Sequence, residues 1–313
     1  MTRKQKTVAT ITVVLGLGLL LAPFIPAWLF WHRIRQFEQA VGVRDAWYFT
    51  KSDDLLHLGK HIGIRYVGNP AFRQVLGDTL SGTFSEVNAV VIEEPTRNKL
   101  KALKFVDDTK RLHVKGPATD DCVGVIYPPL SRLEVLTFWE TGLDDTALEE
   151  IASGNSLTSL SLVGAPAVSS EGLQRTASRN SIKALFLSGV PGIDGLFPEA
   201  EKTFDNLKTA TLSGRQFGDA TAAQLAKIKS LTLIQWTRGA LTDDGVEQLT
   251  NCDSLRGLWI IDCPITDAAV DYLRGMPKLE ELVLRADISD EAIEKFRAAR
   301  PDCQLTAGRP FNK

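Results

Sequence analysis

Four residues near the start of the chain have the types and the spacing of a metal site. Asp53, Asp54, His57 and His61 follow one another closely, and two histidines four residues apart share one face of a helix, as zinc ligands do. Three such ligands and an open position make a hydrolytic metal centre. The alternative is a solvated helix over residues 52–63 whose acidic residues lie near its positive end. We favour this helix and predict no metal and no cofactor.

His113 is the other histidine that we examined for catalysis. It falls on a predicted strand, on the face that is not buried, and there it has the position of a general base. A base needs a serine or cysteine nucleophile beside it and a carboxylate to orient it, and the chain offers no such set around His113. P-loop, G-x-S-x-G and H-E-x-x-H motifs are also missing. We therefore predict no catalytic residues and a protein without enzymatic activity.

The elements that position these residues follow from a repeat of about 24 residues. Apolar residues occupy positions one, four and six of each unit, and eight frames run from Thr109 to the C-terminus. The first positions are Thr109, Leu133, Leu157, Ile182, Leu207, Leu231, Leu255 and Leu279. Positions four and six lie on the same face of a short strand. A fixed period of this length predicts a solenoid of stacked units.

The second half of each unit predicts a helix. An Asp or Ser begins it, and apolar residues follow three and six positions later, as after Asp243 and Asp267. We assign these first residues as helix caps, because their oxygens accept hydrogen bonds from free N–H groups. In the fourth unit the segment 193–198 replaces the usual helix start, so we expect an irregularity there.

The strings Ile265-Thr266-Asp267 and Leu241-Thr242-Asp243-Asp244-Gly245-Val246, together with the strand pattern, resemble leucine-rich repeats of the ribonuclease-inhibitor-like class in their short bacterial form. The resemblance implies an α/β fold, a right-handed solenoid or horseshoe with parallel strands on the concave face and helices on the convex face. It also implies that Pro301 to Leu305 form a closing strand.

The N-terminal segment 7–31 is uncharged and mostly apolar, and a helix of 25 residues is long enough to cross a bilayer. A cleaved signal peptide is the alternative, since Pro23 and Pro26 interrupt the segment, but small residues at the cleavage positions are missing. We expect an uncleaved single-pass membrane anchor. Basic residues on both sides give a slight preference for a cytoplasmic N-terminus, with the repeats on the extracytoplasmic side.

These features divide the chain into four segments. They are residues 1–32, a cytoplasmic basic tip and transmembrane anchor; 33–108, an N-terminal capping region or small linker domain; 109–306, the solenoid of about eight repeats; and 307–313, a C-terminal tail. Val87, Val90 and Ile92 fit one further rung inside the capping region. The four cysteines fall at different places around the repeat, so we predict free thiols.

The concave face carries the predicted binding site. Residues between positions four and six, and just after six, point away from the core, and the repeat itself gives no structural reason for large aromatic residues there. The alternative is that scattered exposed aromatic residues are ordinary on a protein surface. Trp and Arg are frequent in binding hot spots. The candidate residues are Trp139, Phe186, Trp259, Arg238, Arg256 and His113. Trp236 takes a core position, where we expect a large filler.

These observations favour a membrane-anchored repeat protein that binds another protein through its concave face. With 36 basic and 38 acidic residues the chain has no excess of positive charge that would attract a polyanion, so we exclude nucleic acid as a partner. We expect a monomer. The alternatives are a metal-dependent hydrolase at Asp53, His57 and His61, and a structural spacer in the cell envelope.

Overall fold

The computed structural model describes residues 32–33, 36, 47–49, 55–58, 62–67, 86–105, 107, 109–117, 130–154, 156–190 and 200–310. Within these residues the chain forms one sheet of 13 strands whose order follows the sequence. Strands β4 to β13 pair in parallel, and β1 to β4 pair antiparallel. The predicted α/β solenoid of parallel strands is therefore confirmed.

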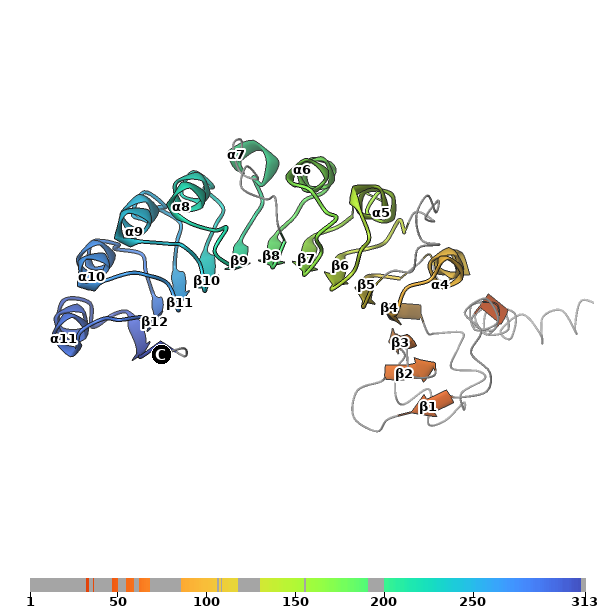
Figure 1. Ribbon diagram of the computed structural model, residues 1–313, viewed down its shortest axis with the longest axis horizontal. Coiled ribbons are helices and arrows are strands. Elements are labelled where there is room, and N and C mark those ends of the chain that lie inside the picture. Colours follow the sequence, from red (N-terminus) through yellow and green to blue (C-terminus); the bar gives the residue numbers. More distant parts are fainter. Residues whose placement is uncertain are drawn as a thin grey trace, which may run out of the picture.

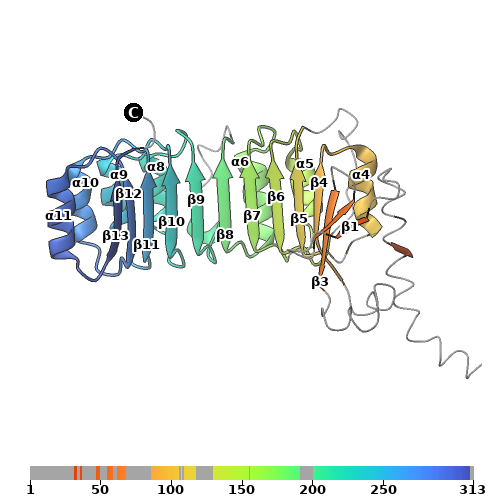
Figure 2. The ribbon, with the colours of Figure 1, turned by 90° about the horizontal axis from the view of Figure 1, so that it is seen from below.

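The strands of the repeats are short and nearly identical in length, because each carries one L-x-L alternation. Their bounds, with those of the strands that precede them, are β1 Trp47–Phe49, β2 Leu55–Leu58, β3 Ile62–Val67, β4 Glu86–Glu93, β5 Arg111–Lys115, β6 Val135–Trp139, β7 Ser159–Val163, β8 Ala184–Ser188, β9 Thr209–Ser213, β10 Leu233–Thr237, β11 Gly257–Ile261, β12 Glu281–Arg285 and β13 Gln304–Gly308. Seen from below, the parallel strands lie side by side in one continuous ribbon (Figure 2).

A layer of helices covers the outer side of this sheet. They are α4 Arg97–Ala102, the short 3-10 helix Leu103–Phe105, α5 Asp145–Ile151, α6 Ser170–Arg179, α7 Ala200–Thr203, α8 Asp219–Leu225, α9 Asp243–Leu249, α10 Asp267–Arg274 and α11 Asp290–Ala299. Strands stack about 4.8 Å apart while helices are about 10 Å wide, so the helix side spreads and the molecule bends. In Figure 1 the helices form the outside of an arc and the strands its inside.

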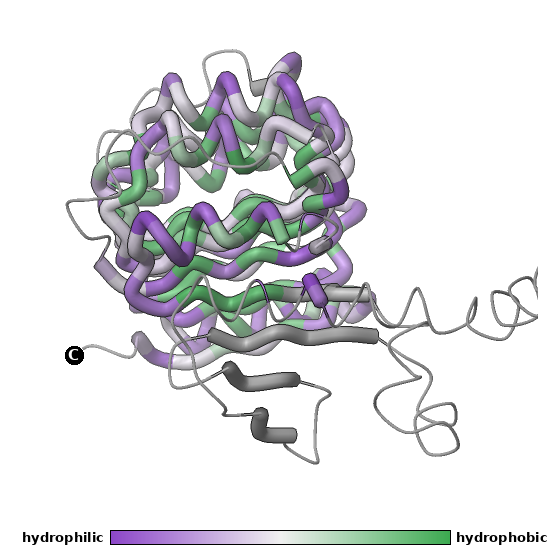
Figure 3. The backbone as a smooth tube through the Cα atoms, turned by 90° about the vertical axis from the view of Figure 1, so that its right-hand side faces the viewer, coloured by the Kyte–Doolittle hydropathy of each residue, from purple (hydrophilic) through white to green (hydrophobic). Residues whose placement is uncertain are grey.

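The core lies between the two layers and runs the length of the solenoid. The second and fourth residues of β5 to β12 are at most 1% exposed, and the helices turn residues such as Leu148, Val246 and Leu273 toward them. Seen along the solenoid, the hydrophobic stretches lie along the strands and the inner sides of the helices (Figure 3). Each unit buries its apolar face only against its neighbours, as a solenoid requires.

The predicted helix over residues 52–63 is wrong. Within this segment β2 pairs antiparallel with β1 and β3, and His57 lies opposite Tyr48 and Gly63 in this pairing. The segment 62–67 alternates Ile, Ile and Tyr with other residues, a pattern that suits a strand added to β4. The spacing of four that would bring two histidines onto one helix face therefore does not apply. Asp53, Asp54 and His61 lie outside the described residues.

The parallel ladder begins with β4, one strand before the Thr109 rung. Val90 and Ile92 of β4 pair with Leu112 and Val114 of β5, and all four side chains are fully buried. The antiparallel strands β1 to β3 lie beyond β4 at the same edge of the sheet. The first parallel strand therefore has a neighbour on its outer side.

The helix caps lie one residue earlier than predicted. The predicted caps are the first helical residues, Asp145, Ser170, Asp243, Asp267 and Asp290. The residue before each of them is the N-cap, and Asp144, Ser169 and Ser289 accept hydrogen bonds from N–H groups three positions on. Sequence spacing does not separate the two readings, because both members of each pair are polar and most are good capping types.

The aspartates at the first helical position instead join neighbouring units. Each accepts the backbone N–H of the next unit's cap residue at 2.7–2.8 Å and its hydroxyl at 2.6–2.7 Å. The pairs are Asp145 with Ser169, Asp219 with Thr242, Asp243 with Thr266, and Asp267 with Ser289. We call this set the aspartate ladder. A Cβ at Gly245 would come within 2.2 Å of Asp219 Oδ1, so this glycine makes room for the carboxylate.

The residue directly after each of the strands β4 to β11 has a positive φ, which turns the chain out of the sheet. The eight positions are Glu94, Gly116, Glu140, Gly164, Gly189, Gly214, Arg238 and Asp262, with φ between 49° and 126°. From each of them the N–H donates to the last carbonyl of the next strand, at 2.6–3.4 Å. Half of them are glycine, which adopts this conformation without strain. The other four have charged side chains, which the turn places at the edge of the sheet.

Three cysteines, Cys252, Cys263 and Cys303, are buried free thiols, as predicted. Burial raises the pKa of all three, that of Cys263 to about 11. Cys122 lies outside the described residues, as do the predicted anchor at 7–31 and the irregular segment 193–198. Among the described helices, none combines the length and the apolar character that crossing a bilayer requires.

Candidate functional site

The concave face is made of the first, third and fifth residues of each strand. In β6, for example, Leu136 and Phe138 are fully buried while Val135 and Thr137 are half-buried and Trp139 is exposed. Strands β5 to β12 pair without a shift in register, so residues of equal rank form straight rows across the sheet. The two outward columns that we predicted from the repeat are the third and fifth of these rows.

Trp139 and Phe186 are the large hydrophobic side chains that stand out from the described surface. Their exposed fractions are 47% and 37%, against 0% for the neighbouring strand residues Phe138 and Leu187. One strand, β7, separates them, and its outward residues there are the smaller Ser161 and Val163. Large aromatic side chains are among the residues that contribute most to protein-binding surfaces.

Trp259 lies in β11, three strands beyond the strand of Phe186, and its side chain is half-buried. Its indole Nε1 donates a hydrogen bond to Glu281 Oε1 of the next strand at 3.1 Å. Its row neighbours are Gln235 and Val283. Trp259 is therefore held in place by β12 and is separate from the pair Trp139 and Phe186.

Trp236 belongs to the other side of the same sheet, as predicted. It is fully buried, and its Nε1 donates to the carbonyl oxygen of Phe217 at 3.0 Å. A Cβ at Gly239 would lie 2.3 Å from that nitrogen, so the turn after β10 is shaped around the indole. Whether a tryptophan lies in the core or on the concave face thus depends on its position in the strand. Even-numbered positions, such as that of Trp236, are buried, and odd-numbered positions, such as those of Trp139 and Trp259, face outward.

The two candidate arginines lie at opposite edges of the sheet. Arg256 directly precedes β11 and forms an ion pair with Glu280, the corresponding residue before β12. Arg238 directly follows β10, in the turn with positive φ, and is exposed. Five strand residues, about 16 Å of chain, separate these two edges. Arg238 and Arg256 therefore flank Trp259 from two sides and do not form one cluster with it.

His113 occupies the third position of β5, at the N-terminal end of the concave face. Arg111 and Lys115 share its strand and face, and Glu93 of β4 lies opposite Lys115. Burial, and then the positive charge of Arg111, lower the pKa of His113. The imidazole is therefore neutral at pH 7 and sits in a basic surrounding, where nothing on its strand activates it as a base.

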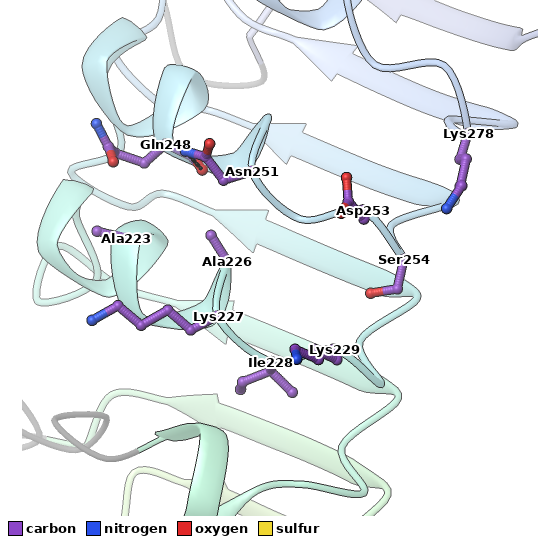
Figure 4. Close-up of a pocket in the computed structure, with 10 residues that line it drawn as sticks. All are labelled: Ala223, Ala226, Lys227, Ile228, Lys229, Gln248, Asn251, Asp253, Ser254 and Lys278. Atoms are coloured by element: carbon purple, nitrogen blue, oxygen red, sulfur yellow. Dashed lines mark hydrogen bonds between the residues drawn. The ribbon is translucent and has the colours of Figure 1, made fainter.

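A pocket of 680 Å³ lies away from the concave face, between α8, α9 and the turns before β10, β11 and β12. Its lining is Ala223, Ala226, Lys227, Ile228, Lys229, Gln248, Asn251, Asp253, Ser254 and Lys278. In Figure 4 the amino groups of Lys227 and Lys278 lie at opposite ends of this pocket. Ser254 donates to the carbonyl oxygen of Leu231, which fixes the turn. Because its polar groups do not converge on one point, the pocket makes no ligand site.

Within the described part of the chain no three His, Cys, Asp or Glu side chains are grouped as metal ligands. The sequence interpretation missed the aspartate ladder, although its signal is present: Asp219, Asp243 and Asp267 recur every 24 residues. It also missed that the strands β6 to β11 carry no charged residue on their open face. This absence of charge could have been found in the sequence by reading the first residue of each strand together with the third and fifth residues that we predicted to face outward.

Comparisons with known proteins give a likeness in solved structures alone. No family model matches the chain, and no curated protein matches it. Among solved structures the chain is similar to an internalin from Listeria monocytogenes, with 13% sequence identity and a TM-score of 0.44, over 76% of this chain and 93% of that chain. The solenoid is established by the strand pairing of this chain itself.

Proposed function

We propose that this chain is a non-enzymatic leucine-rich repeat protein, of the ribonuclease-inhibitor-like class, that binds another protein through its concave face. The observation that carries the proposal is the exposure of Trp139 and Phe186, at 47% and 37%, on a sheet whose opposite face buries every large apolar residue of β5 to β12. Trp259, Arg238, Arg256 and His113 extend the proposed surface toward both ends and both edges. Aromatic residues and arginine are the side chains that contribute most to protein interfaces.

The direct test removes the two tryptophans together. The double variant Trp139→Ala, Trp259→Ala should lose capture of the partner from detergent-solubilised membranes, measured by quantitative mass spectrometry, while its circular dichroism stays that of the wild type. Tyr272→Ala is the matched control, because Tyr272 lies on α10 in the helix layer. Capture that is unchanged in the double variant would remove the concave face as the binding site.

We further propose that residues 7–31 anchor the protein in a membrane and that the repeats lie on the extracytoplasmic side. The support is the uncharged, apolar composition of this segment and the basic residues Arg3, Lys4 and Lys6 before it. Protease added to intact cells should then degrade the C-terminal repeats, and a chain without residues 1–32 should leave the membrane fraction. Repeats that stay protected in intact cells but not in lysed cells would contradict this orientation.

A further inference from the structure

The centre of the concave face contains no charged residue. Six strands, β6 to β11, each turn three residues outward, and none of these eighteen is Asp, Glu, Lys, Arg or His. They are Val135, Thr137, Trp139, Ser159, Ser161, Val163, Ala184, Phe186, Ser188, Thr209, Thr211, Ser213, Leu233, Gln235, Thr237, Gly257, Trp259 and Ile261. We call this set the uncharged floor. Charged residues make up 24% of the whole chain, so their complete absence here needs a cause.

Strand structure alone does not supply that cause. The strands on both sides of the floor keep the same geometry and carry charged residues in the first and fifth rows. Arg111 and Lys115 face outward from β5, and Glu281 and Arg285 face outward from β12. A charged side chain is therefore compatible with an outward position of this sheet. The exclusion of charge is confined to the middle of the concave face.

Charged residues return at once along both edges of the floor. The positions directly before the strands include the exposed residues Glu134, Lys183, Lys208 and Arg256. The positions directly after the strands include the exposed residues Glu140 and Arg238. An aromatic centre depleted of charge, inside a polar and charged rim, is the arrangement found in protein–protein interfaces.

The size of the floor also suits a protein partner. Six strands about 4.8 Å apart, and five residues plus one rim residue at each end, cover roughly 30 by 23 Å, or about 700 Å². A standard interface buries about 800 Å² on each partner. The polar side-chain groups of this surface are hydroxyl groups, one amide and the two indole N–H groups of Trp139 and Trp259. They pair with uncharged donors and acceptors, whereas a charged group buried among them would lose its hydration without gaining an ion pair.

We infer that the partner is a protein whose contacting surface is uncharged at its centre, and that its affinity depends only weakly on salt. This inference rests on the proposed function, since it specifies the chemistry of the same concave face. Charge pairs of the rim act mainly on association rate and register, and salt screens them, whereas contacts of the uncharged floor do not depend on ionic strength.

A phage-displayed random peptide library is the probe for this inference. Peptides are selected on the wild-type chain in dilute salt, where charged sequences have the greatest advantage, and those that also bind the Trp139→Ala, Trp259→Ala variant are discarded. The retained peptides should be poor in Asp, Glu, Lys and Arg relative to the library. Their Kd should change less than about twofold between about 0.05 and about 0.5 M NaCl.

A single new charge provides the second arm. Thr211→Lys places an ammonium in the third row of the floor, on β9, and should weaken the retained peptides at least about tenfold through desolvation of an unpaired charge. Thr306→Lys is the matched control, because Thr306 is exposed in the same row on β13, outside the floor. It should leave the Kd unchanged.

The outcomes separate the two proposals. Retained peptides that are rich in charge, or that lose binding tenfold or more in the higher salt, would overturn the uncharged partner and leave the concave binding site standing. If no selected peptide depends on Trp139 and Trp259 for binding, both the concave binding site and the uncharged partner are refuted. Binding of neutral oligosaccharides such as maltohexaose or cellohexaose to the floor, in the absence of such peptides, would overturn a protein as the partner.

Discussion

The two faces of this solenoid are built from the same repeat but have opposite surfaces. On the helix layer many exposed positions are charged, and α6, α10 and α11 have ion pairs within one helix, as in Glu171 with Arg175 and Glu291 with Lys295. On the concave side the uncharged floor exposes aromatic, aliphatic and hydroxyl groups over six consecutive strands. Exposed ion pairs stabilise a protein little but keep its surface solvated.

The proposed function accounts for this difference, because it leaves the helix layer in water and places the floor against a partner. A solenoid needs its core and its inter-unit hydrogen bonds, and the aspartate ladder supplies such bonds from the helix side. Nothing in the core requires Trp139 or Phe186 to be large, because both point away from it. The variants below separate residues that hold the solenoid together from residues that face a partner.

The largest effect should come from Trp236, which lies on the buried side of the sheet. Trp236→Ala removes a fully buried indole and leaves a cavity, so we expect a loss of about 3–5 kcal/mol in the free energy of unfolding. Trp139→Ala removes the same side chain from the exposed side and should cost less than about 0.5 kcal/mol. Urea unfolding followed by circular dichroism measures both. Equal losses in the free energy of unfolding would contradict the assignment of Trp236 to the core and of Trp139 to the surface.

A smaller loss should follow when the aspartate ladder is broken. In Asp219→Ala the backbone N–H and the hydroxyl of Thr242 lose their acceptor, and we expect a loss of about 1–2 kcal/mol. Asp290→Ala is the matched control: it removes a carboxylate from the same helix position in α11, after which no further helix follows within the described residues. The same urea titration applies, and a control as damaging as Asp219→Ala would count against the ladder.

His113 should give the smallest change in stability, through pH. Burial and the positive charge of Arg111 lower its pKa in the folded chain below the ordinary histidine value of 6.5. As the pH falls below that value, the unfolded chain binds a proton before the folded chain does, so folding stability decreases and the loss is complete below the folded pKa. The drop in urea midpoint between about pH 7.5 and about pH 5.5 should be smaller in His113→Gln. An identical drop in the variant would refute this coupling.

Much of the solenoid could be predicted because its repeat fixes many contacts at once. The register of Leu160, Ile234 and Leu282 in the core follows from one spacing, and so does the outward direction of Trp139, Phe186 and Trp259. The exposure of each aromatic residue could not be predicted in the same way. It depends on neighbours in adjacent strands, such as Glu281, which binds the Trp259 indole.

Two errors have a common origin in local spacing. The segment around His57 has no repeat, and a spacing of four between histidines suggested a helix although the chain there pairs with β1 and β3. The caps were assigned one residue late because Asp243 and Thr242 are both capping types, and their roles differ only once the next unit is stacked beside them. Long-range pairing decided both cases.

The most direct test of the concave binding site is site-specific photo-crosslinking in living cells. A benzoylphenylalanine in place of Phe186 reports on the uncharged floor, and the same residue in place of Tyr272 reports on the helix layer. We predict that one protein is crosslinked from position 186 and that this product is missing from position 272. Crosslinking of that protein from position 272 alone, or equally from both positions, would contradict recognition through the concave face.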